Sequence, residues 1–346
     1  MYKWFAGKRI LKGVVIYAII IFLLSCLFNT VNEKTMRSQI EEQVRMEQTR
    51  LKNTQPEALQ KFAQERRASL IRQYKLDRPM LERILFRTAD ILTFNFGKST
   101  TIKSSDGERD VIKIVGECIP RSLILFTVAA AIEIFLGIFL GLKQAQKPGG
   151  KLDRTTSLMT MIVYGMPTWW LAMIIIMLFV YTVPLFPSGG VHSVPTPTGI
   201  MFVVDMLWHT VLPLFTLVIL GFWGTAFVTR NIVLGTLQED YIMAARARGI
   251  PENKVLYGHT LRTAAPPLIT MALLGLLGSI GGAIVFEGIF SWPGLGNLYW
   301  VAVQTNDIPV LLADLAITTG LYQLGLILLD LIYGFLDPRI KVGGKA

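Results

Sequence analysis

The sequence predicts an all-α membrane protein that crosses the bilayer six times. Of its 346 residues, 52% are hydrophobic and 17% are charged, and the mean hydropathy is +0.49. Soluble domains are nearer a quarter charged. Six apolar segments approach or exceed the roughly 20 residues that a helix needs to cross a hydrocarbon core about 30 Å thick. Because lipid offers the backbone no hydrogen bonds, segments that cross it are expected to be helical.

The predicted spans follow one another along the chain, and helix breakers interrupt two of them. The third contains Gly165-Met166-Pro167, and the fourth contains Pro213 and Gly221. Such breaks are tolerated where neighbouring helices or water satisfy the freed backbone groups. In order, the predicted spans are Ile10–Phe28, Ile119–Leu142, Thr155–Tyr181, Leu207–Val228, Pro267–Phe290 and Val310–Phe335.

Lysine and arginine are confined to alternate short loops. The loops 182–206 and 291–309 contain neither residue, whereas basic residues flank the other span ends. Cytoplasmic loops are the ones enriched in Lys and Arg, so both termini are predicted to be cytoplasmic. A cleaved signal peptide is the alternative for the N-terminus, but no A-x-A-like site follows the apolar run. Residues 1–28 are therefore expected to be a cytoplasmic stub with the first span, and residues 339–346 a cytoplasmic tail.

Residues 29–118 form a long extracytoplasmic segment with dense mixed charge. Within it, 33–74 is predicted to be a charged helical hairpin that turns at Asn53-Thr54-Gln55-Pro56, since proline suits the first turn of a helix. A solvated spacer is the alternative. Past Pro79 only short elements are expected, including one at Val111–Val115. The thin apolar stripes of the two helices are Ile40, Val44 and Leu51 in one, and Leu59, Phe62, Leu70 and Ile71 in the other.

Two cysteines, Cys26 and Cys118, fall near the outer ends of the first two spans. A disulfide between them is one interpretation, because that side of the membrane is often oxidising. Two unrelated buried thiols are the favoured interpretation, because cysteine is readily buried in apolar surroundings.

No motif for enzymatic chemistry is present. Gly97-Lys98-Ser99 has the end of a phosphate-binding loop, but Leu92 stands where the first glycine belongs. The three histidines are scattered, and neither H-E-x-x-H nor G-x-S-x-G occurs. Catalytic, cofactor and metal sites are therefore not predicted. Nucleic-acid binding is not predicted either, because no basic stripe interleaved with aromatic residues occurs.

Four carboxylates fall inside the predicted spans. A charged group in the bilayer is costly, so each is a candidate for a functional or cavity-facing role. Glu133 in the second span and Glu287 in the fifth are the candidates for the pathway, with a structural hydrogen-bonding role equally open. For Asp314 and Asp330, near the ends of the sixth span, the structural role is favoured.

The longest cytoplasmic loop, 239–262, is predicted to be a capped helical elbow. Acidic residues open it, alanines fill its body, arginines lie in its last turn, and Gly249 follows as a helix stop. Pro251 and Glu252 then begin a second helix that is expected to run to about Arg262. Small alanine side chains would let a groove of another protein close tightly around the first helix.

At this loop the chain resembles permease subunits of type I ABC importers, in the oligopeptide, dipeptide and nickel branch. Ala244-Ala245 followed by Gly249 is similar to the coupling-loop motif of that family, although Met243 stands where the general form has Glu. The peptide branch is loose at that position. The segment 33–74 is longer than most members carry. Further segments that match are Leu76-Asp77-Arg78-Pro79, Phe96-Gly97-Lys98-Ser99, Ile119-Pro120, Pro167-Thr168-Trp169-Trp170-Leu171, Leu185-Phe186-Pro187-Ser188-Gly189-Gly190, Phe290-Ser291-Trp292-Pro293-Gly294-Leu295-Gly296 and Leu336-Asp337-Pro338-Arg339.

The resemblance implies a type I importer permease fold in the cell membrane, with a five-helix core at 119–338 and a coupling helix. Such a chain forms half of a translocation pathway with a second, homologous permease, surrounded by lipid. Two ATPase subunits hold ATP and Mg²⁺, and an external binding protein delivers the substrate. This chain itself is expected to hold no cofactor. The residues expected to couple to the ATPase are Glu239, Asp240, Tyr241, Ala244, Ala245, Arg246, Arg248 and Gly249.

The substrate class implied by the resemblance is oligopeptides. An oligosaccharide importer of the same permease type is the alternative, because the external insertion is unusual. A membrane receptor or scaffold whose external hairpin binds a partner is the alternative from another class.

Overall fold

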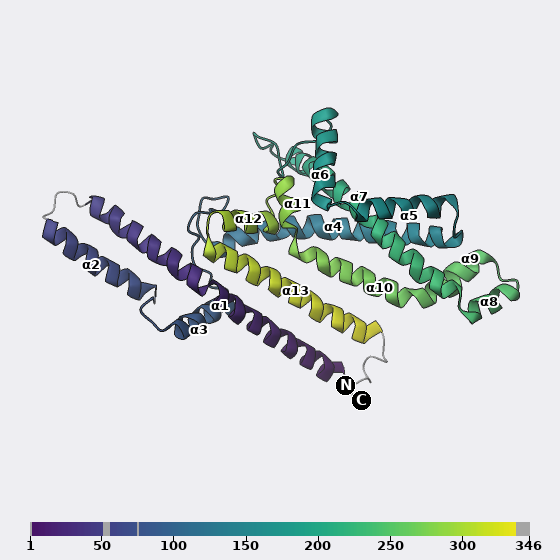
Figure 1. Cartoon of the computed structure of the whole chain (residues 1–346), viewed down its shortest axis with the longest axis horizontal. Helices are drawn as coiled ribbons and strands as arrows, with labels where there is room; N and C mark the ends of the chain where they lie inside the picture. The colour runs from purple at the N-terminus through teal and green to yellow at the C-terminus, as the bar shows by residue number, and fades with distance from the viewer. Residues whose placement is uncertain (1, 51–55, 75, 337–346) are drawn as a thin grey trace. The chain divides into compact units, whose positions relative to one another are not determined.

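The computed structural model describes residues 2–50, 56–74 and 76–336, and within these ranges the regular secondary structure is helical (Figure 1). One isolated bridge joins Lys98 and Asp110. The chain forms two compact units: Met1–Glu117 with Tyr299–Ala346, and Cys118–Leu298. The sequence instead assigned the whole of 119–338 to one core. The predicted tail 339–346, the matching residues Asp337-Pro338-Arg339 and the turn residues 53–55 lie outside the described residues.

The first unit is built on α1 (Tyr2–Arg50), a single helix of 49 residues. The sequence predicts a first span that ends at Phe28 and a separate hairpin over 33–74, but α1 continues without a break from the one into the other. The physical reason is local, because neither glycine nor proline occurs between Val14 and Arg50 to end the helix. The apolar window Ala6–Val31 is the part suited to the bilayer, and the same helix continues beyond it as a charged helix.

Two shorter helices pack against α1. They are α2 (Pro56–Gln73) and α3 (Met80–Leu92). The sequence analysis missed α3, which buries Ile84 and Ile91 on one face. The hairpin of α1 and α2 has a small core that includes Ile40, Val44 and Leu70. Ion pairs flank this core: Arg66 Nε lies 2.8 Å from Glu47 Oε2, and Arg67 Nη2 lies 2.6 Å from Glu41 Oε2.

The last helix, α13 (Ile308–Leu336), packs along the membrane part of α1. Ile21 of α1 and Ile91 of α3 share a buried cluster with Ile308, Leu312 and Ala316 of α13. The end of α3 therefore lies beside the apolar part of α1.

The second unit holds the middle of the chain, and its third predicted span bends at the helix breakers that interrupt it. α4 (Val111–Gln146) begins eight residues before the predicted second span. α5 (Lys151–Tyr164) and α6 (Thr168–Ile176), which continues as the π-helix η1 (Met177–Thr182), meet at 100°. The bend falls at Gly165-Met166-Pro167, because a residue before proline is disfavoured in the α region.

The fifth span lies earlier in the chain than the sequence predicted. After α7 (Ile200–Leu237) and α8 (Asp240–Ala247), one helical run extends over Glu252–Gly281. The expected second elbow helix, to Arg262, is therefore the start of this span, and Pro266-Pro267 do not interrupt it. The run consists of α9 (Glu252–Lys254), η2 (Val255–Thr260), α10 (Leu261–Gly278) and η3 (Ser279–Gly281).

The fifth span ends at Gly282, whose φ of +66° turns the chain. Two short helices follow, α11 (Ile284–Ile289) and α12 (Leu295–Gln304). Within the described residues, five helices are long and apolar enough to cross a membrane, or six if the bent pair counts as one span. The predicted all-α polytopic fold is confirmed.

Candidate functional site

The candidate site is α8, which is seated on the second unit by one face only. Ile242 is fully buried and Ala245 is 8% exposed, whereas Tyr241 and Ala244 on the other face are exposed. Ile242 packs in a cluster with Leu237 of α7 and Val255 of η2. The two alanines of the motif therefore have different surroundings, since Ala245 faces the core and Ala244 faces outward.

The helix ends in a Schellman motif at Gly249. The amide N–H of Gly249 donates to Arg246 O at 2.9 Å, and that of Ile250 donates to Ala245 O at 3.3 Å. Gly249 has a φ of +75°, a region that glycine enters without strain. An added Cβ would have no atom within 4 Å, so a side chain here would cost backbone strain and would meet no neighbour in the chain.

Side-chain contacts fix both ends of the elbow. Arg246 forms an ion pair with Glu252, with Nη2 and Oε1 2.5 Å apart, and the hydrogen bond to that carboxylate raises the pKa of Arg246. The Tyr241 hydroxyl donates to Thr263 Oγ1 at 2.8 Å. Glu239 precedes the helix and its side chain makes no capping bond, Asp240 lies in the first turn, and Arg248 ends the helix exposed.

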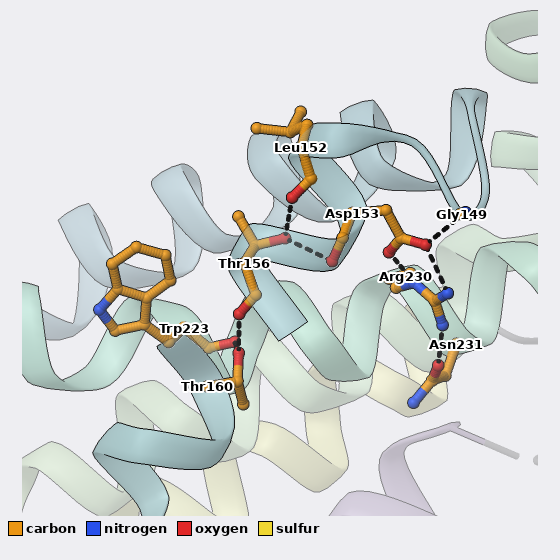
Figure 2. A network of polar contacts seen from close by, with 8 residues as sticks. All are labelled: Gly149, Leu152, Asp153, Thr156, Thr160, Trp223, Arg230 and Asn231. Atoms are coloured by element: carbon orange, nitrogen blue, oxygen red, sulfur yellow. Dashed lines mark hydrogen bonds and ion pairs between the residues drawn. The ribbon is translucent and has the colours of Figure 1, made fainter. Parts of the chain in front are cut away.

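A polar network ties α5 to α7 in the same unit (Figure 2). Asp153 on α5 is 3% exposed and forms an ion pair with Arg230 on α7, whose Nη2 lies 2.8 Å from Asp153 Oδ2. The same carboxylate oxygen accepts the Gly149 amide at 2.8 Å. Two turns further along α5, Thr160 Oγ1 donates to the Trp223 carbonyl at 3.2 Å. Sequence reasoning missed this network, because it counted Arg230 only as a positive charge of a cytoplasmic loop.

Glu133 lies half-buried on α4. It accepts one hydrogen bond, from Thr225 Oγ1 of α7 at 3.1 Å. A Cβ on Gly221 would overlap its carboxylate, so the glycine makes room for the acid. Glu133 therefore keeps acceptor capacity that the described residues do not use, and it stays a candidate for the pathway.

Glu287 is fully buried in a different setting, which we call the outer anchor (Ser122, Gly282, Glu287, Gly294 and Asn297). Its carboxylate accepts the Ser122 hydroxyl at 2.8 Å and the Asn297 amide, in the first turn of α12, at 3.0 Å. Ser122 Oγ in turn accepts the amide of Leu295 at 2.7 Å. These contacts hold the loop between α11 and α12, so we assign Glu287 a structural role rather than a place on the pathway.

A second buried acid, Asp307, holds a loop in the first unit. One of its oxygens accepts the Ser99 hydroxyl at 2.5 Å and the amides of Thr100 and Thr101 at 3.0 and 2.9 Å. Burial raises the pKa of Asp307, but these bonds together outweigh it and lower the pKa below its ordinary value. Ser99, the last residue of the segment that looked like the end of a phosphate loop, thus begins a cradle for a carboxylate of the same chain, and the residues after it supply the backbone donors.

The remaining sequence candidates have simple surroundings. Asp330 forms an ion pair with Arg9, whose Nη1 lies 2.9 Å from Asp330 Oδ2, and Asp314 is 4% exposed. Cys26 and Cys118, both within the described residues, form no disulfide.

Apolar spans of bilayer length, with the one-sided helix α8 between two of them, define a multi-pass membrane protein. The chain belongs to the family described as binding-protein-dependent transport system inner membrane component, whose profile matches residues 133–342. It is therefore a multi-pass inner membrane protein. The predicted membership among permease subunits of type I ABC importers, in the peptide-transport branch, is confirmed.

Curated relatives cover most of the chain. The oligopeptide transport system permease protein AppB of Bacillus subtilis is 33% identical over 281 residues, which span 81% of this chain and 87% of AppB. The dipeptide transport system permease protein DppB of Escherichia coli is 32% identical over 298 residues, which span 80% of this chain and 86% of DppB.

A solved structure of the MetNI methionine ABC transporter in an inward-facing conformation has the same fold. It matches with a TM-score of 0.51 and 19% sequence identity, over 65% of this chain and 96% of that chain. The predicted type I importer permease fold is therefore confirmed.

Proposed function

We propose that this chain is one of two permease subunits that together form the pathway of an ATP-driven oligopeptide importer. The relatives support the substrate class, because they carry the names of oligopeptide and dipeptide transport permeases. The family description supports delivery by a binding protein on the outer side. Membrane lipid surrounds the apolar helices.

The observation that carries the coupling role is the one-sided burial of α8. Its inner face is anchored by Ile242 and Ala245, whereas Tyr241, Ala244 and Arg248 remain exposed. In our proposal a groove of an ATPase subunit covers this outer face. Because Ile242 ties α8 to α7, movement of the ATPase would be passed to the membrane helices. ATP and Mg²⁺ belong to the two ATPase subunits, and no nucleotide site is assigned to this chain.

Two matched glycines test the coupling role. Gly249 and Gly149 have φ values of +75° and +73°, and an added Cβ would meet no atom within 4 Å at either. Gly249→Val and Gly149→Val should therefore carry a similar backbone cost, of at least about 1 kcal/mol. Both variants are to be reconstituted in vesicles with the second permease, the ATPases and the binding protein. Peptide uptake and ATPase turnover are then measured.

We expect Gly249→Val to assemble in the membrane but to lose most peptide-stimulated ATPase activity, whereas Gly149→Val retains it. Wild-type uptake by Gly249→Val would show that the loop does not couple. If oligosaccharides and not peptides stimulate the ATPase turnover of the unaltered complex, the proposed substrate class is wrong and oligosaccharides take its place.

A further inference from the structure

Two arginines on α3 line a small cavity in the first unit. Arg83 and Arg87, one helical turn apart, border a partly open space of about 100 Å³ together with Glu33 of α1. The Arg83 side chain is 14% exposed, and its Nη2 donates to Glu33 Oε2 at 2.8 Å. Its Nε and Nη1 are buried and have no hydrogen-bond partner among the described residues. Unpaired buried donors are costly, so their retention needs an explanation.

Two carboxylates, Glu33 and Asp90, border this cavity together with the two arginines, but among the described residues only Glu33 forms a hydrogen bond or ion pair with either arginine. Glu33 is shared, since its other oxygen lies 3.0 Å from Arg37. Arg87 forms no hydrogen bond or ion pair within the described part of the chain. Burial lowers the pKa of Arg87, repulsion from Arg83 lowers it further, and the attraction of Asp90 opposes both. Among the described residues, the half-buried guanidinium of Arg87 therefore has no hydrogen-bonded anion.

A much larger cavity adjoins the small one. It measures about 1020 Å³, and Met36, Tyr74, Arg87 and Asp90 border both spaces. Its wall carries amide and hydroxyl groups, among them those of Gln39, Gln43 and Asn95. This space is far larger than a single inorganic anion needs, and its polar wall suits a protruding loop of another protein.

We propose that Arg83 and Arg87 receive the carboxylate of an acidic side chain that the external binding protein inserts through the larger cavity. The proposal rests on the function proposed above, because it needs such a partner. A guanidinium binds a carboxylate through two parallel N–H donors, and arginines in desolvated pockets are typical sites where a few residues carry most of the affinity. Arg87 is the principal contact, because its guanidinium forms no hydrogen bond or ion pair among the described residues, and Asp90 attracts it only through space. Arg83 adds its two unpaired donors.

The test is the docking of the binding protein to the reconstituted importer. ATPase stimulation is titrated with peptide-loaded and with empty binding protein for the unaltered chain, Arg87→Gln, Arg87→Lys and Arg83→Gln. Arg45→Gln is the control, since Arg45 is an exposed arginine of the same hairpin. Arg87→Gln should raise the binding-protein concentration that gives half-maximal ATPase stimulation at least tenfold and leave basal ATPase turnover unchanged. Arg45→Gln should change that half-maximal concentration less than twofold. Arg87→Lys should be intermediate, because lysine keeps the charge but not the two-pronged geometry.

The thermal stability of the permease without binding protein separates docking from a structural role. Arg83→Gln breaks the bond to Glu33 and so should lower the melting temperature. Arg87→Gln removes a half-buried charge that has no hydrogen-bonded partner, and should leave the melting temperature unchanged or raise it. A lower melting temperature for Arg87→Gln would identify a structural arginine and overturn the proposal.

Three further results would also overturn it. Superimposable titrations of Arg87→Gln and the unaltered chain would exclude a docking contact. A shift seen only with loaded binding protein would assign the carboxylate to the peptide. Stabilisation of the unaltered chain by inorganic phosphate, lost in Arg87→Gln without a docking defect, would identify a small-anion site. If no binding protein stimulates the unaltered importer, the proposed function fails, and this inference with it.

Discussion

The coupling loop and the outer anchor each contain a glycine with positive φ, Gly249 and Gly282. The surroundings of Gly249 are open, whereas those of Gly282 are crowded. An added Cβ at Gly249 would meet nothing within 4 Å, whereas one at Gly282 would lie 2.6 Å from Glu287 Oε1. Around Gly249 the outer face of α8 is exposed. Around Gly282 the carboxylate of Glu287 is fully buried and hydrogen-bonded within the chain.

This difference in burial separates two roles that a motif can have, which are to maintain the fold and to contact a partner. The outer anchor is complete within the chain, so its residues maintain the fold. The coupling loop is buried only on its inner face, and in our proposal an ATPase subunit covers the exposed outer face. Substitutions in the outer anchor should therefore reduce stability first, and those on the outer face of α8 should reduce transport first.

The largest effect is expected at Glu287. Glu287→Leu leaves the Ser122 hydroxyl and the Asn297 amide without their acceptor, at about 1–3 kcal/mol for each buried group. We expect at least a tenfold loss of folded protein in the membrane, together with a lower melting temperature after purification. Glu133→Leu is the matched control, because Glu133 is only half-buried and accepts one hydrogen bond within the chain. Equal melting temperatures for the two variants would contradict the structural role of Glu287.

Asp307 extends the comparison to a buried carboxylate in the first unit. Its pKa is lowered in the folded protein, so its stabilisation is complete above the ordinary value of 3.8 and is lost as the pH falls through the lower folded value. Asp307→Asn should cost about 1–3 kcal/mol at neutral pH, because an amide cannot accept as strongly at the cradle. It should also flatten the loss of stability in acid. Unfolding midpoints of the unaltered chain and the variant, measured from neutral to acid pH, check both predictions. If the stability of the variant falls with pH as steeply as that of the unaltered chain, Asp307 is not the group responsible.

The two alanines of α8 allow the same comparison within a single helix, because Ala245 is buried and Ala244 is exposed. Ala245→Leu overfills the inner face and should cost about 1–3 kcal/mol. Ala244→Leu is on the exposed face and should change stability by at most about 0.5 kcal/mol, yet it should weaken copurification with the ATPase subunits. Melting temperature and the ATPase content of purified complexes are the two measurements. Equal stability losses would mean that both alanines face the core.

The smallest effect is expected for the ion pair between Arg246 and Glu252. Their side chains are 41% and 56% exposed, so water screens the pair. Arg246→Gln should cost about 0.2–1 kcal/mol, less at high salt. Thermal unfolding at two ionic strengths checks this. A loss of stability as large as that of Glu287→Leu would mean that the ion pair is needed to hold the elbow together.

The sequence predicted the elements whose signals are local. Apolar runs located the spans, and Gly249 located the end of α8, because both signals lie within a few residues of the feature they define. The prolines gave two different outcomes: the interruption predicted at Gly165-Met166-Pro167 is present, whereas Pro267 does not begin the fifth span as predicted. Pro167 marks a bend of 100°, whereas Pro267 lies within a continuous helix that begins at Glu252.

Partners distant in sequence were not predictable. Asp153 pairs with Arg230 across 77 positions, and Asp307 binds Ser99 across 208. Nothing near either acid in the chain distinguishes it from a solvated one. The same holds for Arg87, whose burial depends on how α3 packs against α1.

The continuity of α1 has a mechanical consequence. At 1.5 Å per residue, its 49 residues form a rod about 74 Å long, more than twice the thickness of the hydrocarbon core. About 29 Å of that rod extends beyond Val31. A rod without glycine or proline past Val14 acts as a lever: a force on its outer end tilts the membrane part of the same helix. A contact made with the hairpin of α1 and α2 would thereby be transmitted to the apolar part of α1, because no hinge lies between them.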